Sequence, residues 1–188
     1  MNRKMVKSVA FLLVLICSLM FACKSTSATN ANVANSESKI GSKVYFAAAL
    51  FNESEREYNL RIASILESYG YEVFLPQRDG LNPDILKGKS DEEIIEIIFE
   101  NDVEEINKAD ILFAVLDGAV PDEGMCVEIG IAYASGKRCY GIRNDLRVSE
   151  HGFDLNLMIA GCFDKIFKDT DYEKLISSFK EYLSNNRL

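Results

Sequence analysis

The sequence predicts an α/β fold, an open, mostly parallel five-stranded sheet with helices on both faces. Short apolar runs that suit strands alternate with longer segments whose apolar residues recur at helical spacing. Most of the short runs are continuously apolar, which is typical of strands buried on both faces. Helix start signals, in which glutamate follows a polar cap after three residues, stand directly before three of the helical segments.

The elements are expected in strictly alternating order. Strands are expected at residues 43–50, 71–75, 110–116, 138–142 and, as a last short strand, 163–167. Helices are expected from Asn52 to Gly70, from Ser90 to about Lys108, from Gly124 to Ser135 and from Thr170 to about Asn185. Residues 76–89 contain two prolines and two glycines and are expected to form a loop over the active face.

This alternation predicts right-handed crossovers and a flavodoxin-like or Rossmann-like sheet. Such sheets bind ligands beyond the carboxyl ends of their strands, so polar residues just after strand ends are the candidate functional residues. The sequence contains no internal repeat, no G-x-G-x-x-G and no P-loop lysine motif. A nucleotide-cofactor enzyme and an NTPase are therefore not indicated.

The first 23 residues have the layout of an export signal. Three basic residues precede the apolar run 9–22, and no acid occurs among them. A run of about 14 residues is shorter than the roughly 20 that a membrane-spanning helix needs. Residues 19–23 (LMFAC) resemble the lipobox of bacterial lipoproteins, which implies that Cys23 is lipidated and becomes the mature N-terminus. Ordinary signal cleavage and a signal anchor remain the alternatives.

Residues 24–42 are rich in Ser, Thr, Asn and Ala and are expected to form a flexible tether. The remaining residues, 43–188, have the length of one domain. Acyl chains on Cys23 would hold this domain at a membrane of the cell envelope. Three of the 21 basic residues and no acid lie before residue 23, so 18 basic residues remain against 29 acidic ones. Because such a body repels nucleic acid, small substrates are expected.

The cysteines of the body do not indicate a metal site. Cys126, Cys139 and Cys162 are odd in number, and no pair has the spacing of metal ligands. Each has apolar neighbours close by, which is typical of free thiols in a reduced core.

The densest group of polar residues directly follows the third predicted strand. Residues 117–130 (DGAVPDEGMCVEIG) place Asp122 and Glu123 at the start of a helix, where the helix dipole favours anions. Glu128 lies about one turn further on, among apolar neighbours. A lone carboxylate is costly to bury without a partner, so helical position alone favours Glu128 as an ordinary solvent-facing acid.

A wider pattern changes that interpretation. Residues 124–134 (GMCVEIGIAYA), followed by Gly136-Lys137, resemble the motif of the nucleoside 2-deoxyribosyltransferases, a glycine-bearing turn, Glu-x-Gly-x-Ala and Gly-Lys. The resemblance extends from about residue 43 to residue 161. It implies that Glu128 is the nucleophile, that Tyr45 in the opening strand holds it, and that Asp102 handles the leaving base.

The resemblance also implies the substrate contacts. Gln77 falls where the family contacts the base, and Asp122, six residues before Glu128, falls where it binds the sugar. Residues 156–158 (NLM) match the family's Asn-Leu-Met segment, so Asn156 and Met158 are expected at a site shared with a neighbouring subunit in a homo-oligomer. Two features depart from the family. Its members are cytoplasmic, and it often has a small hydroxyl residue where Glu123 stands.

The chemistry agrees with these roles. Cleavage of an N-glycosidic bond develops oxocarbenium character at C1', which a nearby carboxylate stabilises and captures, and the leaving base needs an acid. The expected function is transfer of 2-deoxyribose between purine or pyrimidine bases, with deoxynucleosides and free nucleobases as substrates and neither a metal nor an organic cofactor. The alternatives are hydrolysis of deoxynucleosides or their 5'-monophosphates, and a non-catalytic nucleoside-binding surface lipoprotein.

Overall fold

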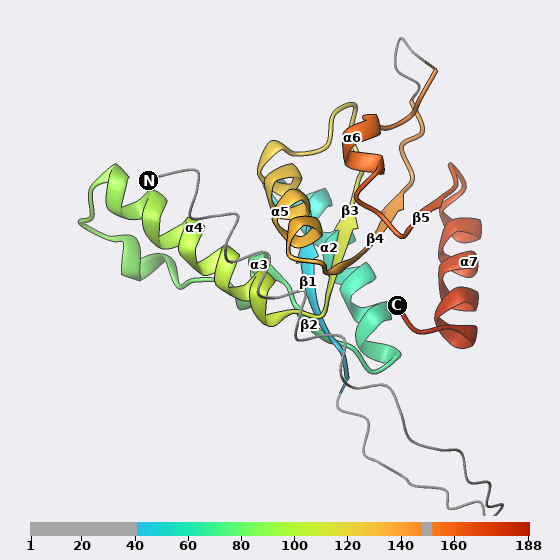
Figure 1. Ribbon diagram of the computed structural model, residues 1–188, viewed down its shortest axis with the longest axis horizontal. Coiled ribbons are helices and arrows are strands. Elements are labelled where there is room, and N and C mark those ends of the chain that lie inside the picture. The colour runs from blue at the N-terminus through green and yellow to red at the C-terminus, as the bar shows by residue number, and fades with distance from the viewer. Residues whose placement is uncertain (1–40, 148–151) are drawn as a thin grey trace, which may run out of the picture. The chain divides into compact units, whose positions relative to one another are not determined.

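Five parallel strands form one sheet. The computed structural model describes residues 41–147 and 152–188. The strands are β1 (Lys43–Ala47), β2 (Glu72–Phe74), β3 (Ile111–Val115), β4 (Arg138–Arg143) and β5 (Lys165–Lys168). They lie in the order β2-β1-β3-β4-β5, and every pair is parallel (Figure 1). The predicted fold is confirmed, and the order reverses between β1 and β3, which is where such sheets bind ligands.

The four predicted helices form in the predicted order, with three differences: the single turn α6 (Leu157–Ala160) was not predicted, and residues 76–89 and the cap of α7 differ from the prediction. The helices are α2 (Glu53–Ser68), α3 (Pro76–Asp79), the 3₁₀ turn η1 (Pro83–Leu86), α4 (Asp91–Lys108), α5 (Glu123–Ala134), α6 (Leu157–Ala160) and α7 (Tyr172–Asn185). The expected loop 76–89 therefore contains two single helical turns, each started by a proline whose fixed φ suits a first helical position. The cap of α7 is Asp171 rather than Thr170, because the Asp171 carboxylate accepts from the backbone of Glu173 and Lys174.

The other two predicted capping boxes form as expected. Asn52 Oδ1 accepts from Glu55 N at 3.0 Å, and the Glu55 carboxylate accepts from Asn52 N at 3.2 Å. Ser90 and Glu93 make the same reciprocal pair at the start of α4. Each box satisfies backbone N–H groups that a helix start otherwise leaves unpaired.

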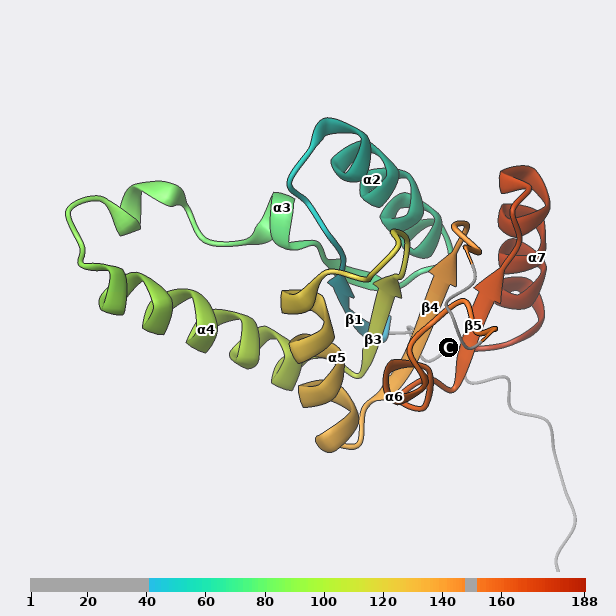
Figure 2. The ribbon, with the colours of Figure 1, turned by 90° about the horizontal axis from the view of Figure 1, so that it is seen from above.

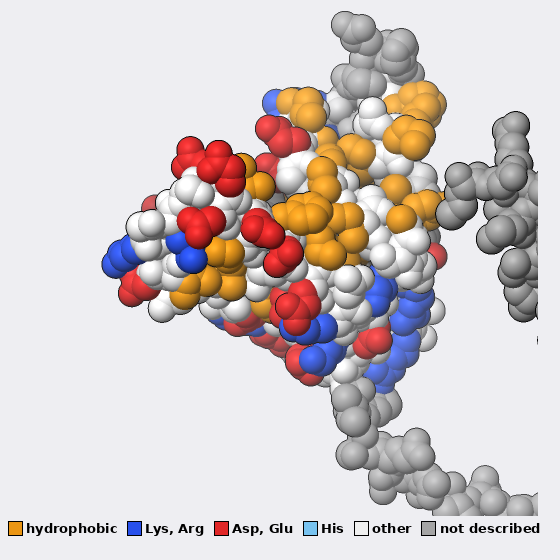
Figure 3. Space-filling view, turned by 60° about the vertical axis from the view of Figure 1, so that its left-hand side comes forward, with side chains coloured by type: hydrophobic (Ala, Val, Ile, Leu, Met, Phe, Trp, Pro, Cys, Tyr) orange, Lys and Arg blue, Asp and Glu red, His pale blue; other side chains and the backbone are white. Residues whose placement is uncertain are grey.

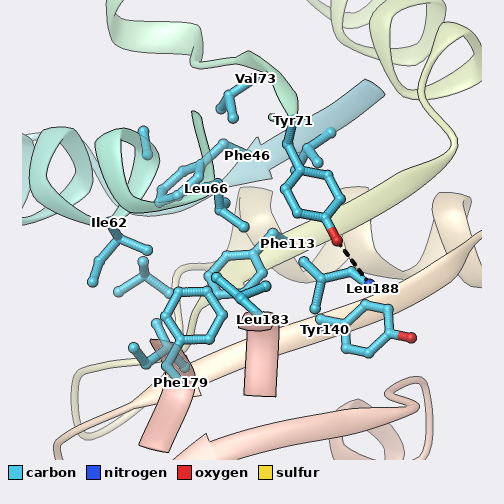
Figure 4. Close-up of a cluster of buried hydrophobic side chains, with 14 of the residues drawn as sticks. Phe46, Ile62, Leu66, Tyr71, Val73, Phe113, Tyr140, Phe179, Leu183 and Leu188 are labelled. Atoms are coloured by element: carbon cyan, nitrogen blue, oxygen red, sulfur yellow. Dashed lines mark hydrogen bonds between the residues drawn. The ribbon is translucent and has the colours of Figure 1, made fainter. Parts of the chain in front are cut away.

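One face of the sheet carries the larger core (Figure 4). Alternate residues of the strands, including Phe46 and Phe113, pack against Ile62 and Leu66 of α2 and Phe179 of α7. Strand side chains alternate between faces, so the residues between these point the other way. Figures 1 and 2 show α2 and α7 on this side of the sheet.

The opposite face is covered mainly by α5 and by the end of α4. Tyr45 and Leu112 of the sheet pack here against Met125 and Ile129 of α5 and Ile106 of α4. The rest of α4 extends past the edge of the sheet, together with α3 and η1 (Figures 1 and 2). Ile106 is the one fully buried residue of α4 in the described structure.

The predicted export signal, Cys23 and the tether up to residue 40 lie outside the described residues. The last two residues of the predicted tether, Gly41 and Ser42, lie against the turn before β2. Glu72 N donates to Ser42 O at 3.2 Å, and a Cβ on Gly41 would stand 2.0 Å from Gly70 O. None of the helices within 41–147 and 152–188 has the length and apolar character that crossing a membrane requires.

Candidate active site

A hydrogen bond between β1 and α5 forms the centre of the site. The Tyr45 hydroxyl donates to Glu128 Oε1 at 2.8 Å, across 83 residues of sequence. Tyr45 is fully buried because it lies on the sheet face that α5 covers, and its ring stacks on Phe74 of β2 at 5.7 Å between centroids. Glu128 is half-buried, with its carboxylate turned toward the sheet. It is not an ordinary solvent-facing helix acid.

Burial and neighbouring acids change the acidity of Glu128. The pKa of Glu128 is raised to about 7, chiefly by burial and also by the negative charges of Asp102 and Asp122, while the bond from Tyr45 lowers it. Burial also raises the pKa of the Tyr45 hydroxyl, with further contributions from Glu128 and Asp102. The four side chains therefore share one electrostatic environment, although they come from β1, α4, α5 and the turn before α5.

Asp102 reaches this group from the fourth turn of α4. It is half-buried, and burial raises its pKa, while the amide of Asn101, which donates to Asp102 Oδ1 at 3.2 Å, opposes the change. The helix brings Asp102 to the site because its final turns pack on the sheet through Ile106. A carboxyl group with a raised pKa is better suited to donate a proton to a ligand.

Asp122 is the cap of α5. Its Oδ2 accepts from Met125 N at 2.8 Å, which leaves Oδ1 for another partner. Gly124 makes room for this carboxylate, because a Cβ there would stand 3.2 Å from Asp122 Oδ2. The turn that leads to Asp122 from β3 passes through Gly118, whose φ of +105° favours glycine.

Gln77 lies in α3, directly after β2, and both ends of its amide are bonded to α2. Its Oε1 accepts from Asn59 Nδ2 at 3.0 Å, and its Nε2 donates to Arg56 O at 2.8 Å. The carboxyl end of β2 lies beside that of β1, because Tyr45 pairs with Phe74. Gln77 is therefore held at the edge of the sheet where the other candidate residues gather.

Asn156 and Met158 lie apart from the Tyr45–Glu128 bond. Asn156 caps α6 by accepting from Met158 N at 2.9 Å and from Ile159 N at 3.4 Å. In the described ranges no hydrogen bond joins Asn156 to Tyr45, Glu128 or Asp122. Both residues line an open cavity of about 760 Å³, and the Met158 side chain is 83% exposed. The other residues that line it include Ala119, Val120, Pro121, Arg147, Phe153 and Leu157.

Arg143 is a site-supporting residue that the sequence did not indicate. It is fully buried at the end of β4, where its guanidinium donates to Leu116 O and, at 3.2 Å, to Gly118 O. Its Nε lies 3.6 Å from the carboxylate of Asp154. Arg143 thus connects the turn that leads to Asp122 with the segment that leads to Asn156. In the sequence, the one indication of this role is that a basic residue ends the otherwise apolar strand segment before it.

Asn59 is a second such residue. It is 2% exposed on the face of α2 that otherwise carries Ile62, Ala63 and Leu66. A buried amide in an apolar stripe requires partners, and it has them in Ala49 O and Gln77 Oε1. The helical spacing from Asn59 to Ile62 and Leu66 was the available signal.

The three cysteines of the body are free thiols in the described structure. Cys139 is buried, whereas Cys126 and Cys162 are partly exposed, so the expectation of a buried thiol is confirmed for Cys139 and wrong for the other two. Within residues 41–147 and 152–188, no group of three or more His, Cys, Asp or Glu side chains is arranged to hold a metal ion.

The match to a known family covers every candidate site residue from Tyr45 to Met158. The sequence profile described as "Nucleoside 2-deoxyribosyltransferase" matches residues 44–158, from the strand of Tyr45 to Met158. The chain belongs to the nucleoside 2-deoxyribosyltransferase family. Family membership indicates that the chain is an enzyme.

Solved structures agree with that assignment. The 2-deoxyribosyltransferase from Bacillus psychrosaccharolyticus is 28% identical, with a TM-score of 0.57 over 71% of this chain and 95% of that one. A conserved protein from Enterococcus faecalis V583 is 23% identical, with a TM-score of 0.60 over 77% of this chain and 98% of the other. A Clostridium botulinum CMP N-glycosidase shares the fold at 18% identity, with a TM-score of 0.51 over 74% and 98% of the two chains. No curated protein sequence matches the chain.

Proposed function

We propose that this nucleoside 2-deoxyribosyltransferase family member transfers 2-deoxyribose between purine or pyrimidine bases through a covalent glycosyl-glutamate on Glu128. The observation that carries the proposal is the 2.8 Å bond from Tyr45 to Glu128, beside two further acids. A hydroxyl that donates to one carboxylate oxygen orients the other for attack on an electrophilic carbon. An acid nearby is what a leaving base needs.

The first half-reaction breaks the bond between C1' and the base nitrogen. Glu128 supplies the electron pair for a new C1'–O bond, and the electrons of the broken bond pass to the base. A proton from Asp102 neutralises the departing base. Charge that builds up on the sugar in the transition state is stabilised by the Glu128 carboxylate.

The second half-reaction reverses these changes with a different base. A nitrogen of the incoming base attacks C1' and displaces Glu128, while the proton of that base returns to Asp102. Two inversions at C1' give net retention of configuration. Water in place of the base yields free deoxyribose, so hydrolysis is the competing outcome. Asp122 and Asn156 are proposed to bind the sugar hydroxyls, and Gln77 and Met158 to contact the substrate.

The reactive state requires an ionised Glu128 and a protonated Asp102. The Tyr45 bond favours the anion of Glu128, since it lowers the pKa of that group against the effect of burial. A bound base removes the remaining water from the half-buried Asp102, and loss of water raises the pKa of a carboxyl group. Binding of the base therefore favours the protonated form of Asp102, which the first step needs.

Hydrolysis of deoxynucleoside 5'-monophosphates is the second candidate among the reactions of such sites. It is less favoured here because a phosphate dianion would meet Asp122, Glu123 and Glu128 near the start of α5. The connection after β1 offers Ala48, Ala49 and Leu50 rather than donor side chains. A non-catalytic nucleoside-binding protein is disfavoured because it has no need of a nucleophile paired with an acid.

An exchange assay tests the proposal. The purified chain is incubated with deoxyinosine and adenine, and deoxyadenosine, hypoxanthine and free deoxyribose are quantified. We expect deoxyadenosine from the native chain and a loss on the order of 10³-fold or more in Glu128→Gln, which keeps the Tyr45 contact but cannot attack. Glu123→Gln, an exposed acid on the same helix, is the matched control. Undiminished exchange in Glu128→Gln, or none in the native chain, would refute the mechanism.

We further propose that the enzyme works as a homo-oligomer. Val120, Leu157 and Met158 are each at least 60% exposed, and Phe153 beside them is 48% exposed. Figure 3 shows hydrophobic side chains gathered in the middle and upper part of one face of the molecule. Exposed apolar patches of this kind are typical of subunit contacts. A neighbouring subunit would cover the cavity beside Asn156.

We also propose that the enzyme is exported and held at a membrane of the cell envelope through a lipid on Cys23. The basic start, the apolar run and the lipobox-like residues 19–23 support this. The full chain, expressed in a bacterium that processes lipoproteins, should enter the membrane fraction and carry labelled fatty acid. Cys23→Ser should lose the label and leave the membrane fraction, whereas Cys126→Ser should keep both. Label that persists in Cys23→Ser would exclude this anchor.

A further inference from the structure

A short chain of hydrogen bonds links α2 to the proposed base-contacting glutamine. Asn59 is 2% exposed, and its Nδ2 donates to Ala49 O at 2.9 Å and to Gln77 Oε1 at 3.0 Å. Gln77 Nε2 donates to Arg56 O at 2.8 Å. The chain therefore begins at one backbone carbonyl and ends at another, with two side-chain amides between them.

The two backbone carbonyls fix the direction of this chain. A carbonyl oxygen can only accept, so Ala49 O requires the NH₂ of Asn59, and Arg56 O requires the NH₂ of Gln77. Turning Asn59 over would place its oxygen against Ala49 O and Gln77 Oε1. Turning Gln77 over would place its oxygen against Arg56 O and its NH₂ against that of Asn59. Either change places donors against donors or acceptors against acceptors, so the observed orientation of the two amides is favoured.

The fixed direction determines what Gln77 presents outward. After its bonds to α2, the amide retains one N–H of Nε2 and one lone pair of Oε1. The direction of the chain of hydrogen bonds sets which of these two atoms is the donor and which the acceptor. Free adenine presents an amino donor at position 6 beside an acceptor at N1, whereas hypoxanthine presents an acceptor at position 6 beside a donor at N1. A fixed amide edge distinguishes the two bases, while one that turns freely does not.

We infer that Asn59 is a positioning residue that locks the orientation of the Gln77 amide and thereby sets the discrimination between 6-amino and 6-oxo bases. This inference rests on the proposed function, in which Gln77 contacts the base. Asn59 does not itself touch the substrate. It acts through Gln77, with Ala49 O as the anchor that prevents its own amide from turning over.

The test measures binding of free bases to the purified full chain by titration calorimetry, which requires no turnover. The native chain should bind adenine and hypoxanthine with dissociation constants that differ by about tenfold or more. In Asn59→Leu the ratio should fall by about threefold or more, because the exposed bond from Gln77 Nε2 to Arg56 O alone then favours the native orientation of the amide. Ser64→Ala, on the exposed side of the same helix, should keep the native ratio.

A second series separates positioning from a general effect on the fold. Gln77→Met should itself bring the ratio close to one, and adding Asn59→Leu to Gln77→Met should change it no further, because Asn59 acts through Gln77. Asn59→Ser is made in parallel. The single O–H of serine cannot donate to both Ala49 O and Gln77 Oε1, and serine introduces no bulky apolar group. Thermal unfolding of each variant identifies any that do not fold.

The outcomes distinguish this inference from the proposed function. A native ratio near one, no binding of either base, or an unchanged ratio in both folded Asn59 variants would overturn the inference. Base discrimination that depends on Asn59 in a chain with no exchange activity would support the inference and refute the proposed transfer. Exchange activity together with a ratio of dissociation constants that stays the same in the Asn59 variants would support the proposed transfer and refute the inference.

Discussion

Two glutamates of α5 show how strongly surroundings decide the properties of one residue type. Glu123 lies exposed in the first turn, while Glu128, five residues later, is half-buried and accepts a hydrogen bond from Tyr45. Burial raises the pKa of Glu128 to about 7, so its charge changes within the physiological range. If the reaction needs the Glu128 anion, kcat/KM should therefore fall as the pH drops through this value, because kcat/KM reports the groups of the free enzyme.

Tyr45→Phe tests the contribution of the hydroxyl. The Tyr45 bond lowers the pKa of Glu128, so its removal should raise that pKa. The acid limb of kcat/KM against pH should move to higher pH, and the loss of activity should be larger at pH 6 than at pH 8.5. The pH–rate profiles of native enzyme and variant provide the measurement.

The opposite shift would show that Tyr45 does not stabilise the Glu128 anion. Tyr58→Phe is the matched control, because the Tyr58 hydroxyl is also buried but has no hydrogen-bond partner in the described residues. Its pH profile should stay that of the native enzyme.

At the scale of elements, α4 differs from α2 in what supports it. Helix α2 buries Asn59, Ile62, Ala63 and Leu66 against the sheet, whereas α4 fully buries only Ile106 near its end. The first turns of α4 extend past the sheet (Figures 1 and 2). Their stability therefore depends more on the local capping box than on tertiary packing, and Asp102 is carried by this helix.

Ser90→Ala should loosen the first half of α4. Loss of an N-cap costs about 1 kcal/mol, and here it should appear as faster hydrogen exchange of the backbone amides of residues 94–99, with a smaller effect on global unfolding. Asn52→Ala, the equivalent change in the packed helix α2, should instead lower the midpoint of global thermal unfolding. Equal exchange patterns in the two variants would contradict this difference. Hydrogen exchange followed by mass spectrometry gives both readings.

Local signals explain why the elements were predictable. The capping pairs Asn52 with Glu55 and Ser90 with Glu93 form between residues three apart, so the sequence contains the whole interaction. The same logic placed the start of α7 one residue early, because Thr170 and Asp171 are both good caps and the choice between them depends on how the chain leaves β5. The turns α3 and η1 were missed because one helical turn is too short to show periodicity.

At the scale of the whole molecule, the exposed apolar residues around α6 form the main hydrophobic surface patch near the site. Leu157→Asp would place a charge in the proposed subunit contact. We expect the molar mass measured by light scattering to fall to that of a smaller assembly, and exchange activity to fall with it, because a neighbouring subunit is proposed to complete the site. Lys180→Asp, a charge change on the outer side of α7, should alter neither. A monomeric native enzyme with full activity would contradict the proposal.

The sequence by itself determined the order of strands and helices, their alternating burial, two of the three capping boxes and the family motif around Glu128. These depend on residues close together in the chain or on a pattern within one segment. The residue types within each segment are enough to recognise these features, since hydrophobic periodicity and capping act over at most a few turns.

Only the tertiary structure decided which distant side chains meet. Tyr45 and Glu128 are 83 residues apart, and they bond because β1 and α5 share one face of the sheet. The raised pKa of Glu128 arises from burial and from acids on other elements, and the orientation of Gln77 arises from Asn59. Desolvation, Coulomb interaction and hydrogen bonding act through space, so their outcome depends on the fold rather than on sequence spacing.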